Sequence, residues 1–332
     1  MFSVTNDRGF VPQSEQFEGR DMVGEDIKAY KIIHTNDFAY NPARINVGSI
    51  AMYTGEKPCM ISSLYVCFKT TKEVNNEWLM HLLKTPKMNY YYNVNGEGGV
   101  RVYLFYPNFA RIRMSIPIIE EQKKIAKLLN LIDERIATQN KIIEDLKKLK
   151  YAISHILFSS KFTNHLSYIA NVVMGQSPSS NAYNDQGIGM PLVQGNLDIS
   201  NGKTTPRLYT SEFNQTAEEG NIILTVRAPV GEVAKATKNV CLGRGVCAII
   251  PHEENMSDFI YQYLTFYKFM WRKYEQGSTF TSINGSDVRN ILCPEVRNVS
   301  ILTLLDSKIS TEERVVKLYQ KQKQYLLRQM FI

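Results

Sequence analysis

The feature that most constrains this fold is a long helical pattern that occurs twice. The first copy runs from about Glu120 to Phe158, and its seam positions recur in alternating steps of four and three over more than four heptads. The second copy repeats the same spacing at one constant offset (298 − 125 = 173). The first seam is Ile125, Leu129, Ile132, Ile136, Gln139, Ile143, Leu146, Lys150, Ile153 and Leu157, and the second is Asn298, Leu302, Leu305, Ile309, Glu312, Val316, Tyr319, Lys323, Leu326 and Met330.

The polar interruptions of the two seams also coincide. At the same offset Gln139 matches Glu312, Lys150 matches Lys323, and Asp133 matches Asp306. The alternative is two unrelated amphipathic helices, each packed on its own domain, for which these shared exceptions would be a coincidence. At about 1.5 Å per residue each helix is roughly 50 to 60 Å long, and a heptad stripe of that length is typical of a helix with a partner helix. We therefore expect an antiparallel coiled coil in which the shared polar positions fix the register.

The segments that precede the two helices repeat as well. Each indicates a short helix, Trp78–Leu83 or Phe259–Leu264, then a basic and aromatic loop with glycine, then a strand that enters the long helix. Pro117 aligns with Pro294 at a larger offset (294 − 117 = 177), so the second helix has lost about four residues near its start. Residues 166–180 have no equivalent ahead of the first copy. We expect the first domain to be amino-terminally truncated.

These repeats predict an α+β fold with two similar mixed α/β domains, each followed by a long helix, related as a pseudo-two-fold repeat. The expected layout is a first recognition domain at 1–117, a central helix at 118–160, a second recognition domain at 161–294 and a carboxyl-terminal helix at 295–332.

Composition supports a globular chain that meets a polyanion. The 332 residues suit two domains, and 44% hydrophobic with 21% charged residues excludes a disordered chain. Lys and Arg exceed Asp and Glu by 39 to 32, which gives a net charge of +7. This balance favours nucleic acid as a partner.

Several classes of protein and site are not expected. The five cysteines form no C-x-x-C pair and have no ligand-like spacing with the histidines, so we expect reduced thiols and no metal site. The amino terminus has no signal-peptide pattern, and no run of about 18 apolar residues occurs that could span a membrane. We expect a soluble, cytoplasmic protein.

The motifs of common catalytic sites are not found in the sequence, because the required residues do not occur at the required spacing. No G-x-G-x-x-G follows a strand, and Gly202-Lys203-Thr204 is not a P-loop because position 197 is leucine. Asn41-Pro42 lacks the second proline and the aromatic residue of an amino-group DNA methyltransferase site. The histidines are scattered, and the paired carboxylates are adjacent in sequence, where capping or solvation explains them. We expect recognition without catalysis, and no cofactor.

The whole chain resembles a specificity subunit of a type I restriction-modification system. The strongest signal is Ile116-Pro-Ile-Ile-Glu-Glu-Gln-Lys-Lys-Ile-Ala126, which runs into Leu131-Ile-Asp-Glu-Arg-Ile136. Gln176-Ser-Pro-Ser179 and the blocks at 9–14 and 38–42 are similar to the target-recognition domains of that family. One departure is Val296-Arg-Asn-Val-Ser300, which stands where the second helix would have a Glu-Glu-Gln-like start.

The resemblance implies that each recognition domain reads one half of a bipartite, interrupted site in double-stranded DNA. It further implies that the helical regions bind methyltransferase subunits, and that adenine methylation and ATP-dependent cleavage belong to partner subunits, including a restriction endonuclease. Two alternatives stay open: a coiled-coil scaffold without sequence-specific DNA binding, and an enzyme with an unrecognised site.

The candidate residues fall into two sets. The DNA-reading set lies in loops and strand ends that the repeat equates, and comprises Arg44, Asn46, Asn93, Asn95, Arg101, Gln194, Asn196, Arg227, Arg244, Lys273, Gln276 and Thr279. The set for helix pairing and partner docking comprises Ile125, Leu129, Ile132, Ile136, Gln139, Ile143, Leu146, Leu302, Leu305, Ile309, Glu312, Val316, Tyr319 and Leu326. Tyr90, Tyr91, Tyr92 and Trp271 are interpreted as packing residues.

Overall fold

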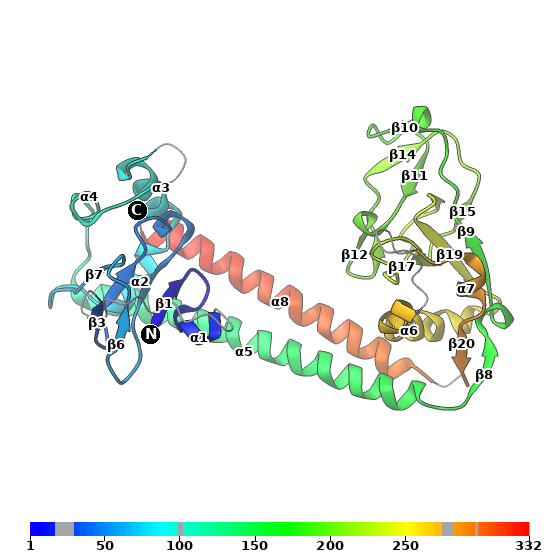
Figure 1. Cartoon of the computed structure of the whole chain (residues 1–332), viewed down its shortest axis with the longest axis horizontal. Coiled ribbons are helices and arrows are strands. Elements are labelled where there is room, and N and C mark those ends of the chain that lie inside the picture. Colours follow the sequence, from blue (N-terminus) through cyan, green and yellow to red (C-terminus); the bar gives the residue numbers. More distant parts are fainter. Residues whose placement is uncertain (17–29, 99–101, 274–281, 296–297, 332) are drawn as a thin grey trace. The chain divides into compact units, whose positions relative to one another are not determined.

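A computed structural model describes residues 1–16, 30–98, 102–273, 282–295 and 298–331 (Figure 1). The chain folds into two compact units, each with many more contacts inside it than to the other. Unit 1 comprises Met1–Asn140 with Arg314–Ile332, and unit 2 comprises Lys141–Glu313. Each unit therefore contains part of both long helices.

Unit 1 contains two small sheets and a group of short helices (Figure 1). The first sheet has the order β2-β1-β6-β3 and the second has the order β5-β4-β7. The strands are β1 (Phe2–Thr5), β2 (Gly9–Pro12), β3 (Lys31–Ile33), β4 (Phe38–Tyr40), β5 (Ile50–Met52), β6 (Cys59–Ile61) and β7 (Val66–Phe68). The helices are α1 (Gln13–Gln16), the 3-10 turn η2 (Ile45–Val47), α2 (Asn76–Leu83), α3 (Pro86–Asn95) and α4 (Tyr106–Ala110).

Unit 2 has two larger sheets, in the orders β10-β14-β11-β18-β15 and β12-β13-β17-β16-β19-β9, and the pair β20-β8. Its strands are β8 (Phe162–His165), β9 (Ala170–Met174), β10 (Tyr183–Asn184), β11 (Met190–Val193), β12 (Ile199–Ser200), β13 (Lys203–Thr204), β14 (Leu208–Thr210), β15 (Thr216–Ala217), β16 (Ile222–Thr225), β17 (Val233–Lys235), β18 (Val240–Leu242), β19 (Val246–Pro251) and β20 (Leu292–Pro294). Its short helices are η3 (Leu166–Tyr168), η4 (Ser180–Ala182), η5 (Asn196–Asp198), η6 (Glu254–Met256), α6 (Ser257–Tyr267), η7 (Lys268–Lys273) and α7 (Gly285–Arg289).

The two units share one strand topology. In unit 1, β1 pairs antiparallel with β2 and parallel with β6, and β6 pairs antiparallel with β3. In unit 2, β11, β14, β18 and β15 repeat these four roles. The three strands β5-β4-β7 likewise correspond to β17-β16-β19. The sequence repeat is therefore a repeat of fold.

The central strand of each unit alternates its side chains between two cores, as the two-residue period of a strand requires. In β16, Ile222 and Leu224 pack toward α6, whereas Ile223 joins the cluster between the two sheets. In β4, Phe38 packs toward Trp78 of α2, whereas Ala39 joins the other cluster. Strands buried on both faces explain the nearly continuous apolar runs of these segments.

The long helices are α5 (Ile119–Phe158) and α8 (Ser300–Met330), drawn in green and in orange to red in Figure 1. Within unit 2, Lys147 pairs with Glu313 and Lys150 with Asp306, so numbers rise on one helix as they fall on the other. Within unit 1, Asp133 pairs with Lys323. The helices are antiparallel in both units, and the predicted α+β class with two similar units and paired long helices is confirmed.

The predicted segments before α5 were partly wrong. Residues 86–95 form the helix α3 instead of a loop, because Pro86 opens a helix whose first turn is capped by Thr85, with Met88 N donating to Thr85 Oγ1 at 3.2 Å. The expected strand into the long helix forms as β20 in unit 2. In unit 1, residues 111–118 form no strand with any described residue.

The second helix is also shorter than expected. It spans 31 residues against 40 in α5, a difference of nine, where the sequence indicated a loss of about four. Asn298 accepts a hydrogen bond from Ser300 N at 2.9 Å, in the position of a capping side chain, and α8 begins there.

Candidate nucleic-acid interface

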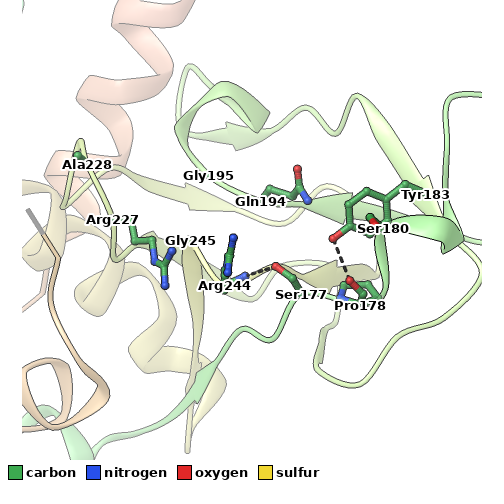
Figure 2. A pocket seen from close by; sticks show the side chains of 10 residues that line it. All are labelled: Ser177, Pro178, Ser180, Tyr183, Gln194, Gly195, Arg227, Ala228, Arg244 and Gly245. Atoms are coloured by element: carbon green, nitrogen blue, oxygen red, sulfur yellow. Dashed lines mark hydrogen bonds between the residues drawn. The ribbon is translucent and has the colours of Figure 1, made fainter. Parts of the chain in front are cut away.

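The described part of unit 2 contains an open cavity of about 600 Å³ at the ends of its central strands (Figure 2). Three of the predicted DNA-reading residues, Gln194, Arg227 and Arg244, lie on its wall. Ser177, Ser180 and Tyr183 from the segment after β9 line it as well. The structure thus brings together predicted residues that are up to 50 positions apart in the chain (244 − 194 = 50).

Arg244 lies in the tight turn between β18 and β19. Its backbone N donates to Ser177 Oγ at 3.1 Å, and Gly243 N donates to the carbonyl of Val193 at 2.8 Å. A Cβ at Gly245 would stand 2.1 Å from the carbonyl oxygen of Gln194, so this close approach requires glycine. The turn is held against the end of β11, and the Arg244 side chain is exposed beside it.

Arg227 follows β16 and is held by the neighbouring backbone. Val226 N donates to the carbonyl of Gly245 at 2.9 Å, and Arg227 forms an isolated antiparallel bridge with Ser282. Among the described residues, neither the Arg227 nor the Arg244 guanidinium takes part in an ion pair. Each guanidinium group carries five N–H donors in a planar fork.

Gln194 is positioned by a buried carboxylate that the sequence did not reveal. Asp198, only 3% exposed, accepts from Gln194 N at 2.9 Å and from Arg207 Nε at 3.0 Å. This arrangement fixes the turn after β11 from which Gln194 projects. Asp198 resembles an ordinary loop residue in the sequence, because its two partners are known only once the turn is folded.

Ser177 is a second residue whose role was missed, although its signal was present. It belongs to the block Gln176-Ser-Pro-Ser179 that carried part of the family resemblance. Gln176 N donates to the carbonyl of Leu242 at 2.9 Å, which places this block against the turn of Arg244. Figure 2 shows Ser177 beside Arg244, with Gln194 near them and Tyr183 on the side of the cavity away from Arg227.

The wall of this cavity suits an anionic, hydrogen-bonding ligand. It carries two arginines, one glutamine and several hydroxyl groups, and no carboxylate among the described residues that line it. Arginine and glutamine are the side chains that bond guanine and adenine edges in two places, and arginine also binds phosphate. No group of three His, Cys, Asp or Glu in the described ranges could hold a metal ion. The side chains of the cavity wall therefore suit the binding of an anionic, hydrogen-bonding ligand.

In unit 1, two of the predicted residues, Arg44 and Asn46, lie on a comparable loop, and Asn93 and Asn95 lie on α3. Arg44 is in the connection from β4 to β5, which corresponds to the connection from β16 to β17 that carries Arg227. Asn46 Nδ2 donates to Asn93 Oδ1 at 3.1 Å, so these two predicted residues are in contact. Asn95 Nδ2 instead donates to the Tyr91 carbonyl of its own helix at 2.9 Å.

Unit 1 also has an open cavity of about 490 Å³ that none of the predicted residues lines. Its basic residues are Arg8 and Lys84. Burial lowers the pKa of Lys84, whose Nζ donates to the carbonyl of Asn6 at 3.2 Å. No sequence pattern associates two residues this far apart.

The remaining predicted residues are less informative. Asn196 opens η5 and does not line the cavity of unit 2, and Lys273 ends η7. Arg101, Gln276 and Thr279 lie outside the described residues. Among the aromatic residues, Tyr92 and Trp271 are fully buried, as packing residues are, whereas Tyr90 is 64% exposed.

The predicted seams face inward in both units. None of the seam residues from Ile125 to Leu157, or from Leu302 to Met330, is exposed, and Leu129 and Leu302 are completely buried. Glu312 is buried and pairs with Lys308 on its own helix. The register role of Gln139 and Glu312 stays a prediction.

All five cysteines lie in described residues, and all are free thiols. Along the described ranges, no helix combines the length and apolar character needed to cross a lipid bilayer.

Comparison with known proteins decides the family. The family described as "Type I restriction modification DNA specificity domain" matches residues 25–148 and again 163–315, so both copies are recognised. The chain belongs to this family. The chain is 28% identical over 300 residues to a Methanocaldococcus jannaschii protein named "Putative type I restriction enzyme MjaX specificity subunit", and the match covers 82% of this chain and 71% of that protein.

Solved structures of the family share the fold. A chain of the type I R-M system, in a structure described as showing complex assembly and conformational transition, has a TM-score of 0.62 at 22% identity and covers 91% of this chain and 83% of its own. The type I restriction-modification S subunit from M. genitalium has a TM-score of 0.57 at 17% identity, covering 90% and 84%.

Proposed function

We propose that this chain is the DNA sequence specificity subunit of a type I restriction-modification complex. In this proposal the domains at 1–117 and 161–294 each read one half of a bipartite, interrupted site in double-stranded DNA. The observation that carries it is the cavity of unit 2, where Gln194, Arg227 and Arg244 converge with no acidic neighbour among the described residues of the wall. The net charge of +7 favours approach to the phosphate backbone.

In this proposal, some side chains of the cavity contact the DNA backbone and position it, and others contact the base edges and read the sequence. Arg227 and Arg244 supply paired donors that fit the O6 and N7 acceptors of guanine, and Gln194 fits adenine. Ser177, Ser180 and Tyr183 supply neutral hydrogen-bonding groups for phosphate or sugar. In unit 1, Arg44 and Asn46 form the counterpart on the loop that corresponds to that of Arg227, and Asn93 of α3 contacts Asn46.

The helices serve assembly. The seam side chains hold α5 and α8 together, and the outward faces retain exposed apolar groups, including Leu131 and Ile142 on α5 and Leu304 and Leu318 on α8. We assign these outward faces to methyltransferase subunits, with the restriction subunit joining through that complex. Adenine methylation and ATP-dependent cleavage then belong to the partners, the chain itself is non-catalytic, and the complex acts in the cytoplasm.

The test is reconstitution with the methyltransferase subunit encoded beside this chain. The complex is expected to bind a specific duplex tightly and to show the steep salt dependence of phosphate contacts. A chain that binds its partner subunits but gives no salt-dependent DNA affinity would support the scaffold alternative instead.

A further inference from the structure

The turn after β11 in unit 2 is built around one buried carboxylate, that of Asp198. Only 4% of this side chain is exposed. The backbone of Asp198 is fixed on both sides, because its N donates to the carbonyl of Gly195 at 3.0 Å and its own carbonyl accepts from Thr205 N at 2.7 Å. The turn itself therefore holds the carboxylate in one place.

The two oxygens of this carboxylate have different partners. Oδ2 accepts from the backbone N of Gln194 at 2.9 Å, and Oδ1 accepts from Arg207 Nε at 3.0 Å. A buried carboxylate is costly unless it is paired and hydrogen-bonded. Asp198 therefore ties Arg207 to the same turn that carries Gln194, which lines the cavity of unit 2.

The guanidinium group of Arg207 is restrained but accessible. Its side chain is 57% exposed, although its partner is buried. Of the five N–H donors of a guanidinium group, Nε carries one and the two terminal nitrogens carry the other four. Within the described ranges, Asp198 is the one ion-pair partner of Arg207. A side chain restrained in this way loses less conformational entropy when it binds a ligand.

Arg207 lies beside Gln194 but outside the cavity. β14 pairs antiparallel with β11, with Leu208 opposite Leu192, so Arg207 is at the end of β11 next to Gln194. It is not one of the residues that line the cavity. Leu197 of the same turn is 68% exposed in the described structure, so the turn is accessible to a large ligand. A cationic fork just outside a base-reading cavity suits a phosphate, which receives about half or more of protein–DNA hydrogen bonds together with sugar.

We propose that the guanidinium group of Arg207 binds a phosphate of the DNA backbone next to the base that Gln194 reads, and that Asp198 is the positioning residue for both. The inference rests on the proposed function, because it assigns a further contact of the same DNA site. The terminal nitrogens of arginine match phosphate oxygens in a planar, charge-assisted geometry. One carboxylate then joins a phosphate contact to a base contact, so the phosphate fixes the register in which the glutamine meets its base.

The first test removes the arginine. Arg207→Gln takes away the charge but keeps an amide donor for Asp198. The chain is combined with the methyltransferase subunit encoded beside it, and the probe is a fluorescein-labelled duplex with the motif that the wild-type complex methylates. Anisotropy is measured between about 50 and 200 mM salt.

The loss of one phosphate contact has a defined signature. The slope of log affinity against log salt is expected to fall by about one, and affinity is expected to fall about five- to tenfold near 0.1 M salt. The methylated motif is expected to stay the same, because a phosphate contact carries no sequence information directly.

The second test removes only the positioning. Asp198→Asn keeps an oxygen for Gln194 N but turns an amide nitrogen toward Arg207, so the hydrogen bond that restrains the guanidinium group is lost. The substitution also raises the net charge by one, which by itself would strengthen binding to DNA. We expect binding to weaken instead, by about two- to tenfold, because a long side chain must then be ordered on binding.

Asp258→Asn is the matched control for this change. It likewise removes a carboxylate from a basic partner in unit 2, Lys235, whose Nζ lies 2.7 Å from Asp258 Oδ1, and it raises the net charge by one. Neither residue lines the cavity. No loss of affinity is expected in this variant.

A double variant, Asp198→Asn with Arg207→Gln, completes the cycle. Its net charge equals that of the wild type, so a lower salt slope in it does not come from overall charge. We expect the same affinity as in Arg207→Gln alone, because Asp198 acts through Arg207. The double variant also leaves no buried charge without a partner, so its salt slope replaces that of Arg207→Gln if the single variant does not fold.

The outcomes separate this inference from the proposed function. A lower salt slope without Arg207, weaker binding in Asp198→Asn and no further loss in the double variant support it. An unchanged slope or a changed methylated motif in Arg207→Gln, tighter binding in Asp198→Asn, or a full additional loss in the double variant overturns it and leaves the proposed function standing. A wild-type complex without salt-dependent DNA binding overturns both.

Discussion

Lys323 Nζ of α8 donates to both carboxylate oxygens of Asp133 on α5, at 2.5 Å to Oδ1 and 2.6 Å to Oδ2. The same relationship occurs in unit 2, where Lys150 Nζ lies 2.6 Å from Asp306 Oδ1. Both members of the second pair are repeat counterparts of the first, with the helices exchanged. One antiparallel register therefore satisfies both ion pairs, and a slip by a turn would break both.

The first prediction concerns these ion pairs. Lys323→Glu places two carboxylates together, and we expect the free energy of unfolding to fall by about 1 kcal/mol, as for a partly exposed pair. Adding Asp133→Lys restores the attraction with reversed sign and should recover part of that loss. Urea denaturation of the two single variants and the double variant measures the coupling. A coupling of zero would show that the pair does not contribute to the register.

The second prediction concerns Gln122, which is completely buried at the start of α5. Its Oε1 accepts from Asn75 N at 2.7 Å, and its Nε2 donates to the carbonyls of Glu73 and Pro117 at 2.9 and 2.8 Å. Gln122→Leu removes these three part-buried hydrogen bonds, so we expect a loss of about 1 to 3 kcal/mol in stability.

Unit 2 offers a matched control for this change. Val299, directly before α8, is a buried residue whose side chain makes no hydrogen bonds. Val299→Leu changes apolar volume without orphaning a backbone group, and its cost should stay below about 1.5 kcal/mol. Equal thermal shifts in the two variants would argue against the hydrogen-bond explanation.

The third prediction is a pH dependence that arises at His81. Burial lowers the pKa of His81, and the hydrogen bond between Nε2 and Asn130 Oδ1, 2.8 Å long, opposes that shift only in part. Nearby Lys323 lowers this pKa, whereas Asp133 and Glu77 raise it. The folded state therefore binds a proton less readily than the unfolded state. Stability is full above the unfolded pKa of about 6.5 and declines as the pH falls below it.

His81→Gln tests this prediction, because glutamine is the residue at the repeat counterpart, Gln262. The variant should lose the part of the pH dependence of the free energy of unfolding that falls just below about pH 6.5. Urea titrations between about pH 5 and 8 report it. An unchanged pH profile would mean that His81 does not contribute.

The fourth prediction concerns the cavity of unit 2. Arg244→Ala removes a candidate base contact and is expected to weaken binding to the specific duplex by about 1 to 3 kcal/mol. A base contact changes sequence preference, whereas a phosphate contact weakens all duplexes alike and lowers the salt slope by about one. Lys238→Ala, at an exposed position that does not line the cavity, is the control. Wild-type affinity in Arg244→Ala would remove this arginine from the interface.

The sequence predicted what depends on local spacing. The seams were visible because heptad spacing needs no knowledge of tertiary contacts, and the shared exceptions at Lys150 and Lys323 made the repeat evident. The helix α3 was missed because an aromatic run outweighed the cap at Thr85. The pairing of β7 with β4 depends on contacts between distant segments that no local pattern reports.

In the candidate site as well, features that follow from local sequence patterns could be predicted, and features that depend on tertiary contacts could not. Gln194, Arg227 and Arg244, which line one cavity, were predicted together because strand ends in the repeat are recognisable, and their role in DNA reading stays a prediction. Asp198 was not, because its role depends on Arg207 and on the backbone of Gln194 in the folded turn.

The most direct test of the central claim is to map methylated adenines in DNA treated with the methyltransferase complex that contains this chain. The wild-type complex should methylate a bipartite, interrupted motif, and the complex with Arg244→Ala should lose or relax one half of that motif while it retains the other. Methylation that is independent of this chain, or a motif in which Arg244→Ala alters both halves equally, would contradict the assignment of one half-site to each domain.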